Sequence, residues 1–284
     1  MLTEIKNEYL TARISDLGAE LKCLISGNKH YIWEGDPHFW DGSSPVLFPI
    51  CSGLIDDTYY YRGEKFTMPK HGFAMNKMFE VESKSNSEVT FLLKDSIETL
   101  AVYPFHFEFR ITYTLFEKKL LVKYKIRNTG ENKMYFSVGA HEGYNCPRGI
   151  EEYDIILPKK TDLVHTFLTS SNTLGFDKTV ILASGNILPL DYKYFTEDAL
   201  IFENIDFSSL MLKNRKTGES VKVTFEGFPY LLLWTRPGAP YICVEPWCGI
   251  TDREGADQNI ETKQGIECIL PSQAFERTHS IEIL

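Results

Sequence analysis

The chain has 284 residues, 43% of them hydrophobic and 24% charged, which is typical of a soluble globular protein with a large core. The formal net charge of -9 argues against binding to nucleic-acid backbones, because such binding needs clustered lysine and arginine. No apolar run approaches the roughly 18 residues of a membrane helix, and no secretion signal opens the chain. We therefore expect a cytoplasmic protein that binds neither nucleic acid nor membranes.

Alternation of apolar and polar residues predicts an all-β chain, because long stretches with helical spacing are absent. In the first half, residues 33–49 are rich in Pro, Gly and Asp and are expected to form a loop, and residues 98–101 fit either a helical turn or a loop. The strands expected in this half are residues 2–7, 10–14, 19–25, 29–32, 56–61, 65–68, 79–84, 88–93, 105–116, 119–128 and 133–139.

The second half continues this pattern after a polar connection that is expected to join residues 157 and 198. The strands expected there are residues 153–157, 198–203, 209–214, 220–225, 231–235, 241–245, 267–270 and 279–284. Many short strands without a linker favour packed antiparallel sheets. The prediction is one domain over residues 1–284, a large antiparallel β-sandwich.

The six cysteines are scattered, without a CxxC pair or a Cys/His spacing typical of zinc sites. Because no secretion signal is present, we expect all six to be reduced. Cys243 and Cys248 lie close to a carboxylate, but cysteine is among the most buried residue types, and both are interpreted as core residues. No metal site is predicted.

Two residues are candidates for acid/base chemistry. His141 follows an expected strand in the segment SVGAHEGYN, and a histidine can gain or lose a proton near neutral pH. Glu245 lies far along the chain, where the expected strand 241–245 ends before Pro246 and Trp247. A proton donor and a proton acceptor at two strand ends would flank one small substrate. The alternative is that both residues have only structural hydrogen-bonding roles.

Four segments in a fixed order resemble the aldose 1-epimerase (galactose mutarotase) family, and in particular its LacX-like branch. These segments are LFPI, MPKHGFA, VGAHEGYNCP and FPYLLLWTRPGAPYICVEPWCGITD, and they span residues 47–252. The resemblance implies a galactose mutarotase-like supersandwich with a sugar site on its concave face. It also implies that His141 is the general acid, that Glu245 is the general base, and that His71 contacts the substrate.

The exchange of sugar anomers is a reaction for which a His/Glu pair is suitable. Interconverting sugar anomers requires a base that takes the proton of the anomeric hydroxyl and an acid that protonates the ring oxygen; the two roles are exchanged when the ring closes again. Each group must lie within about 3 Å of its own oxygen. No cofactor is needed.

Further substrate contacts are expected from Tyr144, Asp198 and Trp247. Asp198 matches an acidic residue that some relatives use to bind sugar hydroxyls, although an acidic residue at a strand start is also common as a polar edge. Aromatic rings suit the apolar faces of a sugar, and core packing is the alternative for each of them. The aromatic candidates are Trp33, Trp40, Tyr144, Phe228 and Trp247.

Two departures from the family pattern concern charge. Relatives usually have an arginine where this chain has Gly53, and another where it has Met75. Arginine suits bidentate phosphate contacts, so its absence argues against a sugar phosphate as substrate. It also leaves open a weakened or lost activity. Arginines on other loops are candidates for replacing the missing cations, namely Arg62, Arg148 and Arg236.

A third departure is Glu142, which follows His141 where relatives commonly have proline. A carboxylate there would raise the pKa of His141, contact a sugar hydroxyl, or remain a solvated loop charge.

Three functions are compared. The first is an aldose 1-epimerase for a neutral hexose or small oligosaccharide, and the second is a carbohydrate-binding or sensing protein without turnover. The third, a hydrolase or lyase, fits less well because glycosidases typically use two carboxylates. The expected partner is a small carbohydrate, and whether the chain forms a homodimer is left open.

Overall fold

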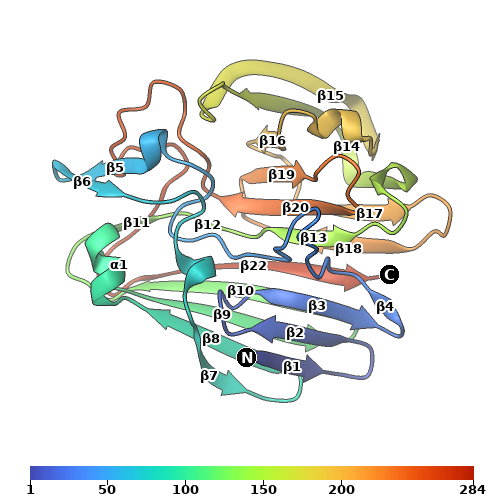
Figure 1. The fold of residues 1–284 in the computed structure, drawn as a ribbon, viewed down its shortest axis with the longest axis horizontal. Coiled ribbons are helices and arrows are strands. Elements are labelled where there is room, and N and C mark those ends of the chain that lie inside the picture. Colours follow the sequence, from blue (N-terminus) through green and yellow to red (C-terminus); the bar gives the residue numbers. More distant parts are fainter.

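The structure is a computed structural model that describes residues 1–284, and it confirms the expected large antiparallel β-sandwich (Figure 1). Its main sheet has 14 strands. These are β7 (Glu80–Lys84), β8 (Glu88–Lys94), β9 (Phe107–Phe116), β10 (Lys119–Asn128), β12 (Val138–Gly139), β13 (Glu142–Asn145), β14 (Tyr153–Leu168), β15 (Leu174–Pro189), β16 (Leu200–Glu203), β17 (Ser209–Asn214), β18 (Ser220–Thr224), β19 (Tyr230–Trp234), β20 (Tyr241–Cys248) and β22 (Ala274–Ile283).

Three smaller sheets and a few short helices complete the fold. One sheet contains β1 (Leu2–Lys6), β2 (Thr11–Ser15), β3 (Leu21–Ser26) and β4 (Lys29–His30). The other two sheets have two strands each, β5 (Thr58–Tyr61) with β6 (Glu64–Thr67), and β11 (Met134–Phe136) with β21 (Glu267–Ile269). The helices are α1 (Ile97–Val102) and four 3-10 turns at Ile55–Asp57, Ala74–Asn76, Ile150–Glu152 and Tyr192–Phe195. None has the length and apolarity that a membrane crossing requires.

The four-stranded sheet packs on β8, β9 and β10 to form the two layers at one end of the sandwich (Figure 1). The two layers pack because their strands have one apolar face. In β9, alternate residues from Phe107 to Leu115 are buried, while those between them are partly exposed. Tyr113 crosses to the other layer, where its hydroxyl donates a hydrogen bond to the carbonyl of Ala19 at 2.7 Å. Burying each large apolar side chain contributes about 1.5–3 kcal/mol.

Helix α1 resolves the ambiguity in the sequence around residue 98. Ser96 accepts a hydrogen bond from the Thr99 amide at 3.3 Å, and the Thr99 hydroxyl accepts one from the Ser96 amide at 2.8 Å. This reciprocal capping box satisfies two amides that have no partner within a helix. The segment is therefore a short capped helix.

Several expected boundaries were wrong. Residues 157–198 are mostly a hairpin of two 16-residue strands, β14 and β15, rather than a polar connection. Much of this hairpin is exposed and its pairing contains register shifts, so it lacks a regular alternation. Strand β20 continues past Glu245 to Cys248. The expected strand 133–139 is divided, and β11 pairs with β21 outside the main sheet.

Candidate active site

His141 and Glu245 occupy opposite positions on neighbouring strands. Gly139 pairs with Trp247 and Glu142 pairs with Val244, so the same antiparallel register places His141 opposite Glu245 in the break between β12 and β13. Residues opposite each other in this way lie on the same face of a sheet and within contact distance. The His141 Nε2 atom is 3.5 Å from the Glu245 Oε2 atom. The two groups therefore lie side by side, and not at two separate strand ends.

The sheet face that carries this pair forms the floor of a cavity of about 320 Å³. Side chains alternate along a strand, so Glu245 and Trp247 of β20 point to the same face as Leu232 and Trp234 of β19. All four line the cavity. Its volume lies at the lower end of the range for small-molecule sites.

The loop over residues 33–50 supplies part of the opposite wall. Trp40 stacks on His141 with ring centroids 5.2 Å apart and an interplanar angle of 29°. The carbonyl of Trp40 accepts a hydrogen bond from Trp33 Nε1 at 2.9 Å, so the two tryptophans fix one another. Trp40 thereby restricts the orientation of the imidazole.

His71 enters the cavity from a second loop, in a fixed tautomer. The Ser52 amide donates a hydrogen bond to His71 Nδ1 at 3.1 Å, and the His71 amide donates one to the Ser52 carbonyl at 2.8 Å. Because Nδ1 is an acceptor, the proton of the neutral ring lies on Nε2. Burial and the neighbouring His141 lower the pKa of His71 well below its usual value. His71 is therefore a neutral hydrogen-bond donor.

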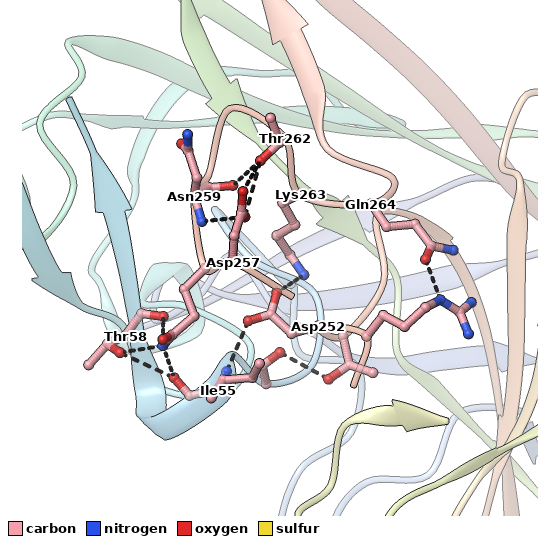
Figure 2. Close-up of polar contacts among 12 residues, drawn as sticks. Ile55, Thr58, Asp252, Asp257, Asn259, Thr262, Lys263 and Gln264 are labelled. Carbon is pink, nitrogen blue, oxygen red and sulfur yellow. Dashed lines mark hydrogen bonds and ion pairs between the residues drawn. The ribbon is translucent and has the colours of Figure 1, made fainter. Parts of the chain in front are cut away.

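The loop that carries Ser52 is anchored from behind by a polar network (Figure 2). The buried carboxylate of Asp252 accepts hydrogen bonds from Lys263 Nζ at 2.7 Å and from the Ile55 amide at 2.9 Å. Thr251 Oγ1 donates a hydrogen bond to the Gly53 carbonyl at 2.9 Å. The segment following β20 thus holds the loop that orients His71.

Burial governs the protonation of the central pair. It lowers the pKa of His141 to about 3 and raises the pKa of Glu245 well above its usual value. Both shifts favour the neutral form of each group. His141 Nδ1 and Glu245 Oε1 are also buried without a hydrogen-bond partner. The pair therefore holds one titratable proton.

Most residues expected at the site line this cavity. They are His71, His141, Asp198, Glu245 and Trp247. Tyr144 does not line it. It is fully buried in the main hydrophobic core, so the expectation that it contacts a substrate is not supported. Tyr144 follows His141 by three residues, and with a period of two it points to the opposite face of the sheet.

Glu142 also points away from the cavity. Its carboxylate lies 2.8 Å from His279 Nε2, and both side chains are buried. The interpretation of Glu142 as a solvated or sugar-binding charge was therefore wrong. Consecutive strand residues face opposite sides, which separates the chemistry of Glu142 from that of His141.

Only some of the aromatic residues and arginines expected at the site line the cavity. Trp40 and Trp247 line it, whereas Trp33 and Phe228 do not. Arg236 lines the cavity, but Arg148 contacts Glu152 at 3.5 Å and Arg62 donates a hydrogen bond to Asn132 at 2.9 Å, both outside it. Eight lining residues were not singled out from the sequence, namely Pro45, Ser52, Lys70, Leu168, Ala199, Ile201, Leu232 and Trp234. For Leu232 and Trp234, the signal was their alternation within β19.

Two clusters bring three potential metal ligands together, each with all its ligand atoms within 4.8 Å of one another. The first consists of His141, Cys243 and Glu245. Burial raises the pKa of the Cys243 thiol well above its usual value, which disfavours the thiolate that a metal would require. The second cluster consists of Cys23, His30 and Glu34 at the β3–β4 edge.

The structure is thus a large antiparallel β-sandwich whose main sheet brings a histidine and a glutamate together in one small cavity. The family model "Aldose 1-epimerase" matches residues 1–254, and the chain belongs to this family.

Individual relatives match over the whole chain. The plasmid-encoded protein LacX of Lactococcus lactis subsp. lactis is 32% identical, and the alignment covers 100% of both chains. A galactose mutarotase related enzyme from Lactobacillus acidophilus is 33% identical, with a TM-score of 0.95 over 100% of this chain and 97% of the other. A galactose mutarotase-like protein from Lactobacillus casei is 29% identical, with a TM-score of 0.94 over 100% of both chains.

Proposed function

We propose that this protein is a cofactor-independent aldose 1-epimerase that interconverts the α and β anomers of a neutral hexose, with His141 as general acid and Glu245 as general base. The observation that carries the proposal is the 3.5 Å separation of the His141 Nε2 and Glu245 Oε2 atoms within one cavity. In a pyranose, the anomeric oxygen and the ring oxygen are bonded to the same carbon. A donor and an acceptor that lie side by side suit two such oxygens.

The single proton of the pair first moves from Glu245 to His141, and the reaction then proceeds from imidazolium on His141 and carboxylate on Glu245. Glu245 takes the proton of the anomeric hydroxyl, a carbonyl forms at C1, the bond from C1 to the ring oxygen breaks, and His141 protonates that oxygen. The C1–C2 bond then rotates. On closure, neutral His141 takes the proton of the attacking hydroxyl and protonated Glu245 returns one to the anomeric oxygen. The pair ends as it began, so protons balance over each cycle.

Several neighbours suit this scheme. His71 would donate its Nε2 proton to a sugar oxygen, and the Asp198 carboxylate would accept from a hydroxyl. Asp198 Oδ1 already accepts from the Ala199 amide at 2.8 Å, which fixes the carboxylate at the cavity wall. Trp247 offers an apolar ring surface. Its Nε1 atom donates to the Ala140 carbonyl at 3.0 Å, next to His141.

The wall carries mixed charges and only one arginine. Lys70 and Arg236 line the cavity together with the carboxylate of Asp198, and the His141–Glu245 pair with its one proton adds no net charge. A cluster of arginines, which would suit the bidentate recognition of a phosphate, is not present at this wall, and we therefore propose a neutral sugar.

The shared proton predicts a broad activity profile. Adding a second proton to the pair removes the base, and the low pKa of His141 places this loss at acidic pH. Removing the one proton eliminates the acid, and the raised pKa of Glu245 shifts this loss to the alkaline side. The two limits belong to the coupled pair rather than to either residue alone.

The test is exchange between anomers, followed by NMR or polarimetry with α-glucose, α-galactose and hexose 6-phosphates. The parent protein should accelerate exchange of at least one neutral hexose. His141→Asn and Glu245→Gln should each lose about 10²–10⁴-fold in rate while remaining folded. His38→Asn, which changes an exposed histidine, is the matched control. Parental exchange rates in either site variant would contradict the assigned role.

A non-catalytic carbohydrate-binding protein is the second candidate, favoured by Met75 at the cavity wall where relatives usually have arginine. In that case calorimetry would detect sugar binding while no sugar tested exchanged faster than in buffer.

A further inference from the structure

A second cavity adjoins the catalytic cavity, which is the one that contains His141 and Glu245. The second cavity has a volume of about 450 Å³. Leu168, Asp198 and Ala199 line both cavities, so these three residues form the boundary between them. A ligand that fills the catalytic cavity can therefore extend past Asp198 without leaving the protein surface.

The wall of the second cavity carries groups that suit sugar hydroxyls. It includes the side chains of Ser170, Asn172, Tyr194 and Glu197. None of these four side chains forms a hydrogen bond or ion pair within the protein, so all four can bind a ligand. Tyr194 is half-buried and combines an apolar ring with a hydroxyl, which allows it to contact both the face and the edge of a sugar.

The tip of the β14–β15 hairpin is a fixed wall at this junction. Thr169 and Thr173 close the turn through a hydrogen bond of 2.7 Å between their hydroxyls. The Leu174 amide then donates to the Asp252 carbonyl at 2.8 Å. The hairpin is thus tied to the same segment that anchors the Ser52 loop, and it holds Leu168 between the two cavities.

From these observations we infer that the second cavity is a binding subsite for a further sugar unit and that the preferred substrate is a reducing disaccharide. This inference rests on the proposed function and specifies its substrate. The reducing unit occupies the catalytic cavity, where its anomeric carbon must stay free between His141 and Glu245. The second unit is consequently linked through a non-anomeric oxygen of the reducing unit, and Asp198 lies beside the linkage.

The experiment compares kcat/KM for anomer exchange of free hexoses with that of reducing disaccharides, using maltose, cellobiose, lactose and melibiose as probes. At least one disaccharide should exceed its own reducing hexose by about tenfold, the factor expected from two added hydrogen bonds. Tyr194→Ala and Glu197→Ala should each lower kcat/KM for that disaccharide several-fold and leave the value for the hexose within about twofold. Glu197 is exposed, so its replacement does not disturb packing. Tyr9→Ala changes an exposed tyrosine at the distant β1–β2 turn and is the matched control.

Two results would overturn the subsite. One is hexose exchange that equals or exceeds that of every disaccharide, and the other is an equal loss for both substrates in Tyr194→Ala. If no sugar exchanges faster than in buffer, the proposed function fails, and calorimetry then decides on the subsite separately. Tighter binding of a disaccharide than of its hexose, abolished by Tyr194→Ala, would support the subsite, and equal binding would refute it.

Discussion

The buried imidazole of His141 should make the protein less stable in acid, and His141→Asn should remove that sensitivity. In the unfolded chain a histidine has its ordinary pKa of 6.5, whereas burial lowers the pKa of His141 in the folded protein to about 3. Between these values the unfolded chain binds the proton and the folded protein does not. The free energy of unfolding therefore falls as the pH falls through this window.

The size of the effect follows from the shift. At about pH 4.5, two units below the unfolded pKa, the contribution is about 2.7 kcal/mol at 1.36 kcal/mol per unit. Glu245 acts in the opposite direction, because burial raises the pKa of this carboxyl and the folded protein therefore holds its proton more strongly than the unfolded chain does. Glu245 is present in the parent and in both variants, so this opposing contribution cancels when they are compared. The shift of Glu245 has the opposite sign, so its contribution to stability decreases as the pH rises above 4.5.

The assay is urea unfolding at about pH 7.5 and 4.5 for the parent, His141→Asn and the exposed control His38→Asn. Between the two pH values, His141→Asn should lose about 2–3 kcal/mol less stability than the parent. His71 is present in all three proteins, so its own lowered pKa cancels in the comparison. If the parent and His141→Asn lose the same stability, burial does not hold the imidazole neutral and the reasoning fails.

Three other substitutions test how the site is supported. Gly72→Ala should destabilise the fold by more than 2 kcal/mol and lower activity, because Gly72 has φ +74 and an added Cβ would overlap the Phe48 carbonyl beside His71; an unchanged melting temperature would argue against this. Lys263→Met should cost about 3–5 kcal/mol in urea unfolding by leaving the Asp252 carboxylate buried without its partner, and Asp252→Asn with Lys263→Met should recover part of that loss. Gly53→Arg should fold with a stability within about 0.5 kcal/mol of the parent, since its Cβ meets only Thr251 Oγ1 at 3.9 Å, and a large gain in exchange rate would show that the missing cation limits activity.

The sequence was sufficient to predict those long strands of the sandwich in which buried and exposed residues alternate regularly. Strands β9 and β10 show this best, since almost every second residue is buried and the expected ranges nearly coincide with the observed ones. The β14–β15 hairpin was missed because exposure on both faces removes the period of two. Its existence depends on backbone pairing, which side-chain polarity does not reveal.

The candidate site was predictable in its residues but not in its geometry. The resemblance singled out His141, Glu245 and His71, and all three line one cavity. Their side-by-side placement depends on the register of β12 and β13 against β20, which connects residues far apart in the sequence. The same register explains why Tyr144 and Glu142 face the core. Lys70 was missed because an exposed lysine in a loop carries no pattern.

His141 and Glu142 are consecutive, and their side chains lie on opposite sides of one sheet. His141 lines the cavity, whereas Glu142 contacts His279 in the core. A slip of β13 by one residue against β20 would bring the carboxylate of Glu142 into the cavity and the imidazole of His141 against the apolar layer. The buried Glu142–His279 contact therefore helps to fix the register that places His141 at the cavity, because a strand shifted by one residue would lose this contact. A one-residue insertion or deletion within β13 would therefore displace both side chains from these positions.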